Sequence, residues 1–426
     1  MRKKVAAFAG LAVAGLVLAG CAGGSGGDSS ASGGQNQVEV FTWWASGSEK
    51  IGLDALVKVF GEQYPDVEFI NAAVAGGAGT NAKATLASRL EAGDPPDSFQ
   101  AHAGAELTDY VEAGQLQDLT SFYSDNKLTD VFPASLIKQL TLDGKIYSVP
   151  SNIHRANVTW VNTAVLKKAG IDPTAGPATL DAWISDLQKL KDSGVESPLA
   201  LGTQWTQVQL FENVLLADLG AKGYTGLWDG STKWDDSSVT DAINDYATLL
   251  GFTNSDYSGL EWDAATQILI DGNAGYNVMG DWAEAAFQQA GWKYGNEYTT
   301  WATPGTDGTF DFLADSFTLP VGAKDEQPAK DWLTTVSSVD GQEAFNLAKG
   351  SIPARTDVDT SAFGAYQQTA LKSFATDTIV SSLAHGAAAK LSWSADIGSA
   401  VGQFATDKNV ATFQTALVAA ADKALG

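Results

Sequence analysis

Hydrophobic and polar positions near the start of the chain predict a strand followed by a helix. The run 38–41 is rich in β-formers and too short for a helix, which indicates a buried strand. From Leu53 to Phe60, apolar residues recur every three or four positions, which indicates a helix with one apolar face. Ser46 and Glu49 fit the S-x-x-E pattern of a capping box and predict where this helix begins.

The same alternation of strands and helices continues along the rest of the chain. Asp143-Gly144 lies between two apolar runs and predicts a hairpin. Thr179 precedes an apolar series at 3–4 spacing and predicts a helix N-cap. Further strands are expected over 67–74 and 274–279, and further helices over 81–91, 205–219, 238–250, 261–271 and 282–290. This alternation predicts an α/β fold with largely parallel sheets, and a mostly helical chain after Pro328.

Trp43 and Trp44 stand between the first strand and the first helix, where an open α/β sheet leaves a crevice for a ligand. Indole rings offer flat apolar faces and N–H donors, a combination that suits a sugar. Both residues could instead belong to the core, because tryptophan is mostly buried. Adjacent residues of a continuing strand point to opposite sides, so at least one of the pair is expected to face the crevice.

The first twenty residues have the pattern of a targeting segment. Arg2, Lys3 and Lys4 precede an apolar run over 5–19 that is short for a membrane span. The run ends in Leu-Ala-Gly-Cys, which resembles the lipobox of bacterial lipoproteins and predicts lipidation of Cys21 after cleavage. An ordinary signal peptide with a chance cysteine is the alternative. Because Cys21 is the only cysteine, the mature chain is expected to contain no disulfide and no cysteine-bound metal.

Residues 21–37 are rich in Gly, Ser, Asn and Gln, which predicts a flexible tether between the lipid and the folded body. No later apolar stretch reaches the length of a membrane span, so the protein is expected to be anchored to a membrane and not embedded in it. The residues after the tether are enough for two or three domains of ordinary size.

Charge and composition narrow the classes of ligand. The formal net charge of −24 argues against nucleic acid and anionic lipid as partners and favours an uncharged or cationic ligand. His102, His154 and His385 lack the close spacing of a typical zinc motif, so no metal site is predicted. The glycine loop 76–79 is not followed by the Lys-Ser/Thr of a phosphate-binding loop, and no cofactor is predicted.

Several short motifs accompany the lipobox: Phe41-Thr42-Trp43-Trp44, residues 71–79, residues 95–104 with their Pro-Pro-Asp and Gln-x-His elements, residues 147–155 and residues 278–282. Together they resemble the extracellular solute-binding lipoproteins of ABC sugar importers, the family 1 solute-binding proteins. The resemblance covers essentially the whole chain. The Trp-Trp and Gln-x-His pairs point to the glucose- and mannose-binding subgroup.

The resemblance implies a type II periplasmic-binding-protein fold, with two α/β lobes, a ligand cleft between them and several hinge crossings. The crossings are expected after Pro150, near Asp315 and near 349–353. The implied division is a signal peptide over 1–20, a tether over 21–37, an N-terminal lobe of 38–152 plus 316–350, and a C-terminal lobe of 153–315 plus 351–426.

The resemblance also implies a set of sugar contacts: Trp43, Trp44, Glu49, Gln100, His102, Trp282, Asp315, Lys349 and His385. Tryptophans can stack on pyranose faces, carboxylates can accept from paired hydroxyls, and the other side chains can donate or accept. Three alternatives stay open: Glu49 could serve only the capping box, Trp282 could be a packing residue with Asp281 as a helix N-cap, and Asp315 could be a solvated turn residue. Trp205 is a further candidate.

The function implied is that of a lipid-anchored receptor on the extracytoplasmic face of the bacterial cell membrane. It would bind a neutral, glucose-like monosaccharide between its lobes, close by hinge motion and deliver the sugar to an ABC permease. A monomer without catalytic activity, cofactor or nucleic-acid partner is expected. The alternatives are a binding protein for a disaccharide or oligosaccharide, a surface glycoside hydrolase with Glu49 and Asp315 as acid and base, and a structural adhesin.

Overall fold

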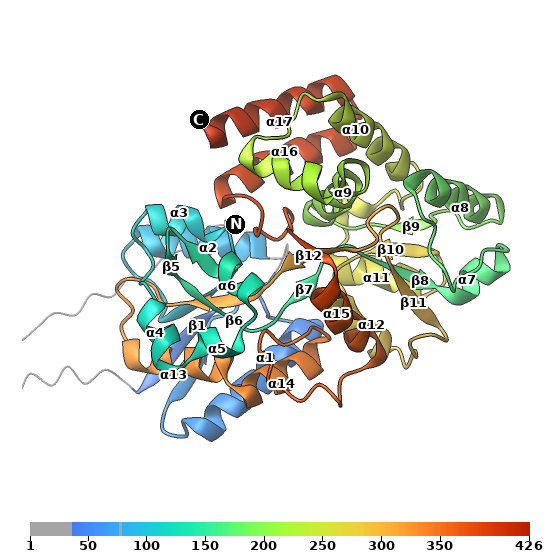
Figure 1. Cartoon of the computed structure of the whole chain (residues 1–426). Coiled ribbons are helices and arrows are strands. Elements are labelled where there is room, and N and C mark those ends of the chain that lie inside the picture. Colours follow the sequence, from blue (N-terminus) through green and yellow to red (C-terminus); the bar gives the residue numbers. More distant parts are fainter. Residues whose placement is uncertain (1–35, 76–78) are drawn as a thin grey trace, which may run out of the picture. The chain divides into compact units, whose positions relative to one another are not determined.

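The computed structural model describes residues 36–75 and 79–426 (Figure 1). The predicted signal peptide, the lipidation site Cys21 and nearly all of the predicted tether lie outside the described residues. Within them, strands and helices alternate as the hydrophobic pattern predicted, and the fold has the two lobes expected from the sequence.

The first lobe is built on a five-stranded sheet with the strand order β2-β1-β3-β13-β6. β1 runs parallel to β2 and β3, whereas β13 runs antiparallel to both β3 and β6. The strands are β1 (Gln37–Phe41), β2 (Glu68–Asn71), β3 (Ser98–His102), β6 (Ser148–Pro150) and β13 (Asp315–Thr318).

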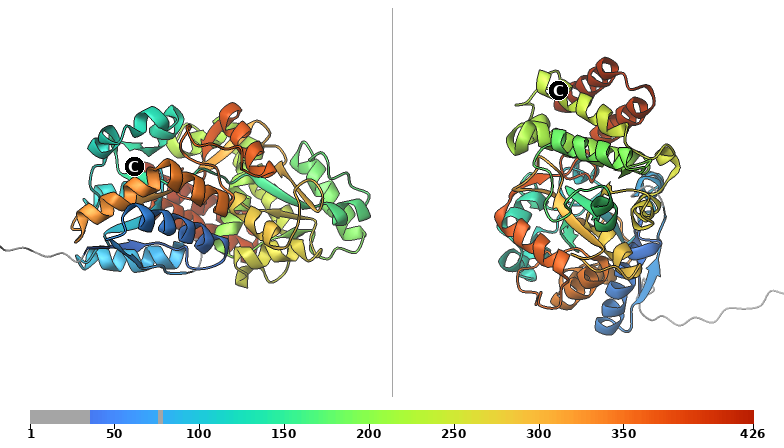
Figure 2. Two further views of the ribbon diagram at one scale, coloured as in Figure 1. Left: turned by 90° about the horizontal axis from the view of Figure 1, so that it is seen from below. Right: turned by 90° about the vertical axis from the view of Figure 1, so that its right-hand side faces the viewer.

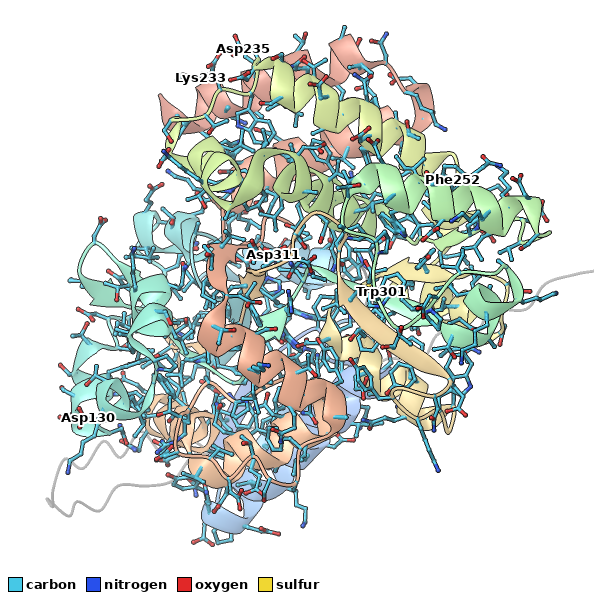
Figure 3. The ribbon with its side chains drawn as sticks, turned by 45° about the vertical axis from the view of Figure 1, so that its right-hand side comes forward. Asp130, Lys233, Asp235, Phe252, Trp301 and Asp311 are labelled. Carbon is cyan, nitrogen blue, oxygen red and sulfur yellow. The ribbon has the colours of Figure 1, made fainter. Side chains whose placement is uncertain are left out.

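Two further sheets carry the other lobe and the region between the lobes. The four-stranded sheet has the order β11-β8-β10-β9, and the three-stranded sheet has the order β14-β12-β7. Their strands are β7 (His154–Arg155), β8 (Val158–Asn162), β9 (Leu199–Ala200), β10 (Tyr276–Val278), β11 (Tyr298–Ala302), β12 (Thr309–Leu313) and β14 (Thr378–Ser381). Figure 3 marks Trp301 on β11 and Asp311 on β12, which lies beneath the long helix α9.

The predicted α/β fold is confirmed, but the expectation of largely parallel sheets is wrong. β13 and β8 each run antiparallel to both of their neighbours. Parallel neighbours need a crossover connection, usually a helix. The chain instead enters β8 directly from β7 and β13 directly from β12, which both lie in the three-stranded sheet, so each strand joins its own sheet from a different one and not through a crossover within it.

The helices of the first lobe cover the five-stranded sheet. Val38 and Val40 of β1 are fully buried, as are Leu53, Leu56 and Phe60 of α1, so the predicted apolar face of this helix packs onto the core. Figure 2 shows α1 beside α14, although almost 300 residues separate them. These helices are α1 (Gly47–Gln63), α2 (Thr80–Glu91), α3 (Leu107–Glu112), α4 (Thr120–Asp125), α5 (Leu128–Val131), α6 (Ala134–Leu140), α13 (Glu326–Ser337) and α14 (Val339–Lys349).

The predicted hairpin and N-cap are both confirmed. Asp143 and Gly144 have φ of 50° and 78° between β4 (Thr141–Leu142) and β5 (Lys145–Ile146), the left-handed pair that a two-residue hairpin turn requires. Thr179 accepts a hydrogen bond from the Ala182 amide at 3.2 Å at the start of α8.

The helices of the second lobe surround the four-stranded sheet and extend to the C-terminus (Figure 1). The helix predicted over 205–219 ends as expected, because Gly220 with φ 65° and ψ 169° leaves the helical region, and a second helical segment follows as far as Asp229. These helices are α7 (Thr163–Lys168), α8 (Leu180–Asp192), α9 (Gln204–Asp229), α10 (Ser237–Leu250), α11 (Trp262–Ile270), α12 (Glu284–Gln289), α15 (Ala365–Thr376), α16 (Leu391–Asp407) and α17 (Val410–Leu425), with 3-10 turns η2 (Tyr257–Gly259) and η3 (Asp281–Ala283).

The chain passes between sheets at the places expected for hinge crossings. It leaves β6 after Pro150 and enters the three-stranded sheet at His154, and it passes from β12 to β13 through Ala314. Ile153 and Ile352 exchange backbone hydrogen bonds of 2.8 and 3.1 Å, which brings the third expected crossing beside the first. The lobe boundaries assigned from the sequence stay a prediction. Within the described ranges, no helix combines the length and the apolar character that a bilayer crossing requires.

Candidate ligand-binding site

A cavity of about 20 Å³ lies where strands of three sheets end or begin. Trp43 follows β1 and His102 ends β3, while Leu313 ends β12 and Asp315 begins β13. The lining side chains combine aromatic rings with charged groups: Trp43, Glu49, His102, His154, Trp205, Trp262, Trp282, Leu313, Asp315, Lys349 and His385. The site therefore draws on segments from along nearly the whole described chain.

Aromatic rings form much of the wall. The ring centroid of Trp282 lies 5.0 Å from that of His385, 5.3 Å from that of His154 and 6.0 Å from that of Trp205. On the other side, the rings of Trp43 and His102 are 5.0 Å apart. Flat apolar faces thus alternate with ring nitrogens around the cavity, which is the pattern of a site for an amphipathic ring.

Two glycines allow these indoles to occupy their positions. A Cβ added at Gly280 would lie 2.0 Å from the Trp282 ring, and a Cβ at Gly79 would lie 2.9 Å from the Trp43 ring. Gly280 is the N-cap of η3, so the alternative that Asp281 caps this helix is wrong.

Several polar side chains at and behind the cavity wall contact the carboxylate of Asp315. Its Oδ1 accepts from Gln100 Nε2 at 3.0 Å, and its Oδ2 accepts from Asn152 Nδ2 at 2.9 Å. His154 Nε2 lies 3.2 Å from the same Oδ2. Although burial raises the pKa of Asp315, His154, Lys349 and His102 together hold it well below its ordinary value. Asp315 is thus a buried, fully ionised acceptor and not a solvated turn residue.

His154 lies between two carboxylates. Its Nδ1 hydrogen-bonds the carboxylate of Asp281, whose other oxygen accepts from the Arg155 amide at 3.3 Å. Burial lowers the pKa of His154, but Asp281 and Asp315 raise it above its ordinary value. The His154 side chain therefore favours the imidazolium form. It links β7, which follows the first crossing, to β13, which follows the second.

Glu49 lies in the first turn of α1 and points at Lys349 and not at its own helix end. Ser46 is the N-cap residue, but no side-chain hydrogen bond caps this helix, so the capping-box prediction is wrong. The Glu49 Oε1 lies 3.4 Å from Lys349 Nζ. Burial, together with Asp315, raises the pKa of Glu49 above its ordinary value, although Lys349 opposes this shift. Glu49 thus places a carboxyl group at the cavity wall.

Trp44 and Gln100 lie behind the cavity and do not line it. The Trp44 indole is fully buried, packs at 4.8 Å on Phe345 and lies 4.7 Å beneath the ammonium of Lys349. The Gln100 Oε1 accepts from Thr42 Oγ1 and from the Trp43 amide, and its Nε2 donates to Asp315. Both residues hold cavity-lining groups in place, so the core interpretation fits Trp44 and the crevice interpretation fits Trp43.

His102 is oriented by the buried carboxylate of Glu106. Its Nδ1 lies 2.8 Å from Glu106 Oε2, which also pairs with Lys83 Nζ at 2.8 Å. Against the effect of burial, Lys83 and His102 lower the pKa of Glu106 to about 2. The carboxylate fixes the ring and leaves the Nε2 of His102 toward Asp315, at 3.9 Å.

His385 has one engaged and one free ring nitrogen. Its Nδ1 hydrogen-bonds Ser382 Oγ at 2.8 Å. The same hydroxyl lies 3.0 Å from a carboxylate oxygen of Glu212. Its Nε2 is buried and has no hydrogen-bond partner among the described residues. Burial, with repulsion from His102 and His154, lowers the pKa of His385 well below its ordinary value, so the ring is neutral.

Comparisons with known proteins identify the family. Residues 46–343 match the family model described as bacterial extracellular solute-binding protein. The chain belongs to this family. An uncharacterised ABC transporter extracellular-binding protein of Pyrococcus horikoshii is 34% identical over 98% of this chain and 95% of its own. A probable sugar-binding periplasmic protein of Brucella suis is 32% identical over 83% of this chain and 84% of its own.

Two more distant similarities concern a glucose-binding relative and the fold. The glucose-binding protein GlcS of Saccharolobus solfataricus is 25% identical over 73% of this chain and 59% of its own. Among solved structures, a chitin oligosaccharide binding protein superposes with a TM-score of 0.80 at 20% identity, covering 91% of this chain and 98% of the other. The latter similarity establishes the two-lobed fold of this solute-binding protein.

The structure brings together most of the residues expected in the site. Seven of the nine lie around the cavity, and Trp44 and Gln100 lie directly behind it. Sequence reasoning left out His154, Trp262 and Leu313 and did not commit to Trp205. The sequence contained a usable signal for His154, because the chain has only three histidines and all three line this cavity. Within the described part of the chain, no group of three or more His, Cys, Asp or Glu side chains could hold a metal ion.

Proposed function

We propose that this solute-binding protein is the sugar receptor of an ABC importer and binds a neutral, glucose-like monosaccharide in the cavity between its lobes. It would deliver the sugar to the permease, and it would carry out no chemistry. The names of its relatives and of its structural neighbours, which include sugar-, glucose- and oligosaccharide-binding proteins, support the substrate class.

The observation that carries this proposal is the composition of the cavity wall. Indole faces of Trp43 and Trp282 lie near the two ionised groups Asp315 and Lys349 and near the unpartnered Nε2 of His385. A pyranose has apolar C–H faces and a rim of hydroxyls. Its hydroxyls would donate to the carboxylates and to His385 Nε2 and accept from Lys349, and charged hydrogen bonds are the stronger kind.

A neutral ligand suits the charges at the wall. Asp315 is ionised, and His154 and Lys349 lie close to Asp315 and to Glu49. Positive and negative side chains at the cavity wall therefore already compensate one another. A phosphorylated sugar would bring a dianion next to two carboxylates in a protein with a net charge of −24, and this repulsion would weaken its binding.

Binding requires the lobes to separate. The cavity volume of about 20 Å³ exceeds only slightly what one water needs, whereas ligand pockets typically span roughly 300–1,000 Å³. Trp43 and His102 follow strands of the five-stranded sheet, while Trp282 and His385 follow strands of the other two sheets. Rotation about the crossings at 151–153 and 314 would open the site, and sugar contacts to both sides would favour closure.

The experiment is a melting and calorimetric screen of the purified protein with glucose, galactose, mannose, glucose 6-phosphate and amino acids. Glucose should raise the melting temperature by the linkage relation, its epimers less, and glucose 6-phosphate least. An inverted hydroxyl leaves a buried polar group unpaired at a cost of about 1–3 kcal/mol. Stronger stabilisation by an amino acid would overturn the proposal, and conversion of a bound glycoside into two products would show a hydrolase.

A further inference from the structure

A buried pair of carboxyl groups lies behind His385, outside the lining of the sugar cavity. Glu212 comes from α9 and Asp311 from β12, which lies beneath that helix in Figure 3, and neither side chain is exposed to solvent. The two groups hydrogen-bond each other, with Tyr224 of α9 and Arg155 of β7 nearby. Two buried carboxyl groups in contact do not both ionise, so the pair holds one proton.

The surrounding donors decide which of the two carboxyl groups keeps this proton. The Oε2 of Glu212 accepts from the Ala384 amide at 2.9 Å, and the Ser382 hydroxyl lies 3.0 Å from Oε1. Neither oxygen of Asp311 has a donor among the described residues. Burial and the Glu212 carboxylate raise the pKa of Asp311 well above its ordinary value. Burial also raises the pKa of Glu212, to about 7, although the bonds from Ala384 and Ser382 oppose this shift. Asp311 is therefore the acid of the pair, and Glu212 is the member that ionises.

The Ser382 hydroxyl has one proton and two neighbours, the Glu212 carboxylate and the Nδ1 of His385 at 2.8 Å. A carboxylate only accepts hydrogen bonds, so the hydroxyl proton goes to Glu212. The contact with His385 then needs a donor on the ring, which is an Nδ1–H group. Because the His385 ring is neutral, it carries one proton, and Nε2 is left with a lone pair.

We propose that Glu212 is a positioning residue for the ligand: through Ser382 it holds His385 in the Nδ1–H tautomer and makes Nε2 a hydrogen-bond acceptor. The serine is needed as the bridge, because Glu212 Oε1 lies 4.0 Å from His385 Nδ1, too far for a direct hydrogen bond. This role rests on the proposed function and deepens it. A sugar hydroxyl at Nε2 must donate its proton, so a group that can only accept is rejected there.

The first test observes the tautomer directly, without any sugar. The protein is purified without a histidine tag and with nitrogen-labelled histidine, and NMR shows which ring nitrogens carry a proton. Since the chain has three histidines, His385→Phe identifies the His385 signals by their loss. At about pH 8, where Glu212 is ionised, the unmodified protein should show a protonated Nδ1 and a bare Nε2 at His385. An Nε2–H tautomer there would overturn the proposal.

Glu212→Gln should move the ring proton. The Ala384 amide needs an acceptor at the Oε2 position, so the NH₂ of the new amide takes the Oε1 position and donates to Ser382. The hydroxyl then donates to His385 Nδ1, and the ring proton moves to Nε2. Ser382→Ala removes the bridge and should lower the fraction of the Nδ1–H form, which provides the same test if Glu212→Gln does not fold.

Asp311→Asn is the matched control, because it changes the other carboxyl group of the same buried pair. Its new amide donates to Glu212 in place of the acid proton and leaves Glu212 ionised, so His385 should keep the Nδ1–H tautomer. Melting temperatures show which variants fold. If the pair had a merely structural role, Glu212→Gln and Asp311→Asn would have the same effect on the tautomer.

The second test links the tautomer to the ligand by calorimetric titration with glucose and its monodeoxyfluoro derivatives. Fluorine cannot donate a hydrogen bond, so the derivative that lacks the hydroxyl at Nε2 should bind the unmodified protein and Asp311→Asn at least about tenfold more weakly than glucose. In Glu212→Gln this ratio should shrink to less than about threefold.

The outcomes separate this role from the proposed function. An unchanged tautomer in Glu212→Gln, or an equal change in Asp311→Asn, with glucose still bound by the unmodified protein, would overturn the role of Glu212 and leave the sugar receptor standing. A tautomer that moves as expected in a protein that binds no sugar would overturn the proposed function, and with it the purpose assigned to Nε2.

Discussion

The Nδ1 of His385 lies 2.8 Å from Ser382 Oγ, and this contact leaves the buried Nε2 as the ring nitrogen without a partner at the cavity wall. Leaving a buried polar atom unpaired costs about 1–3 kcal/mol in the sugar-free protein. A sugar hydroxyl would recover this free energy only on binding. The unpaired Nε2 of His385 therefore lowers the stability of the sugar-free protein and strengthens sugar binding.

His385→Phe should keep the ring and its packing while removing both nitrogens. Loss of the bond to Ser382 and relief of the unpaired Nε2 oppose each other, so the free energy of unfolding should change by less than about 1 kcal/mol. Sugar affinity should fall at least about tenfold. Denaturant melts beside calorimetric titration with glucose measure both quantities, and unchanged affinity would remove His385 from the site.

Trp44→Ala should mainly reduce stability, whereas Trp43→Ala should mainly reduce sugar affinity. Trp44 is fully buried beneath Lys349, so its truncation should lower the free energy of unfolding by about 3–5 kcal/mol. Trp43 lines the cavity, and its truncation should mainly weaken sugar binding, by about 2–4 kcal/mol. Melts and titrations of the two variants side by side provide the comparison. Equal destabilisation with equal affinity loss would contradict this division.

Glu106 should make the protein sensitive to acid. Its pKa is lowered from 4.5 to about 2 in the folded state, so its stabilising contribution is present above pH 4.5 and is lost as the pH falls toward 2. The contribution is about 3 kcal/mol. Glu106→Gln should lower stability at pH 6 and flatten the change in unfolding free energy between pH 6 and pH 3. The matched control is Glu68→Gln, at an exposed position on β2, which should keep the steep dependence.

Gly386→Ala should hinder closure of the cleft. The amides of Ala105 and Glu106 donate to the carbonyls of Ala387 and Gly386 at 3.3 and 2.7 Å, which joins the segment after β3 to the segment after β14. A Cβ at Gly386 would lie 2.3 Å from Glu106 Oε2, and its φ of +68° disfavours a side chain. Glucose affinity should fall at least about tenfold, and the decrease in radius of gyration on adding glucose should shrink.

The control for closure is Gly61→Ala in α1, where an added Cβ meets no heavy atom within 4 Å. This variant should bind glucose as the unmodified protein does. Small-angle scattering with and without saturating glucose supplies the measurement. A radius of gyration that glucose leaves unchanged in the unmodified protein would indicate a rigid site and refute the hinge.

Cys21→Ser should release the protein from the membrane. The Leu-Ala-Gly-Cys tetrad predicts a lipidated N-terminal cysteine, and two acyl chains are about what stable anchoring needs. The unmodified protein should partition into the detergent phase and the variant into the aqueous phase. Equal partitioning would favour an ordinary signal peptide.

Local sequence patterns were enough to predict most helices and strands and much of the site. Apolar spacing over Leu53 to Phe60 located α1, Asp143-Gly144 located the hairpin, and motif resemblance identified the family and seven residues that line the cavity. These features depend on neighbours along the chain or on short motifs, so local pattern is enough to predict them.

The side that each site residue faces depends on contacts between distant segments. Glu49 has the sequence position of a capping residue, but α14 packs against α1 and places Lys349 within 3.4 Å of it. Trp44 lies beneath that lysine, while Trp43, its neighbour in sequence, lies beside His102. His102, His154 and His385 are far apart along the chain, and they meet because three sheets end at one cavity. Contacts between segments so distant in sequence leave no local pattern to read.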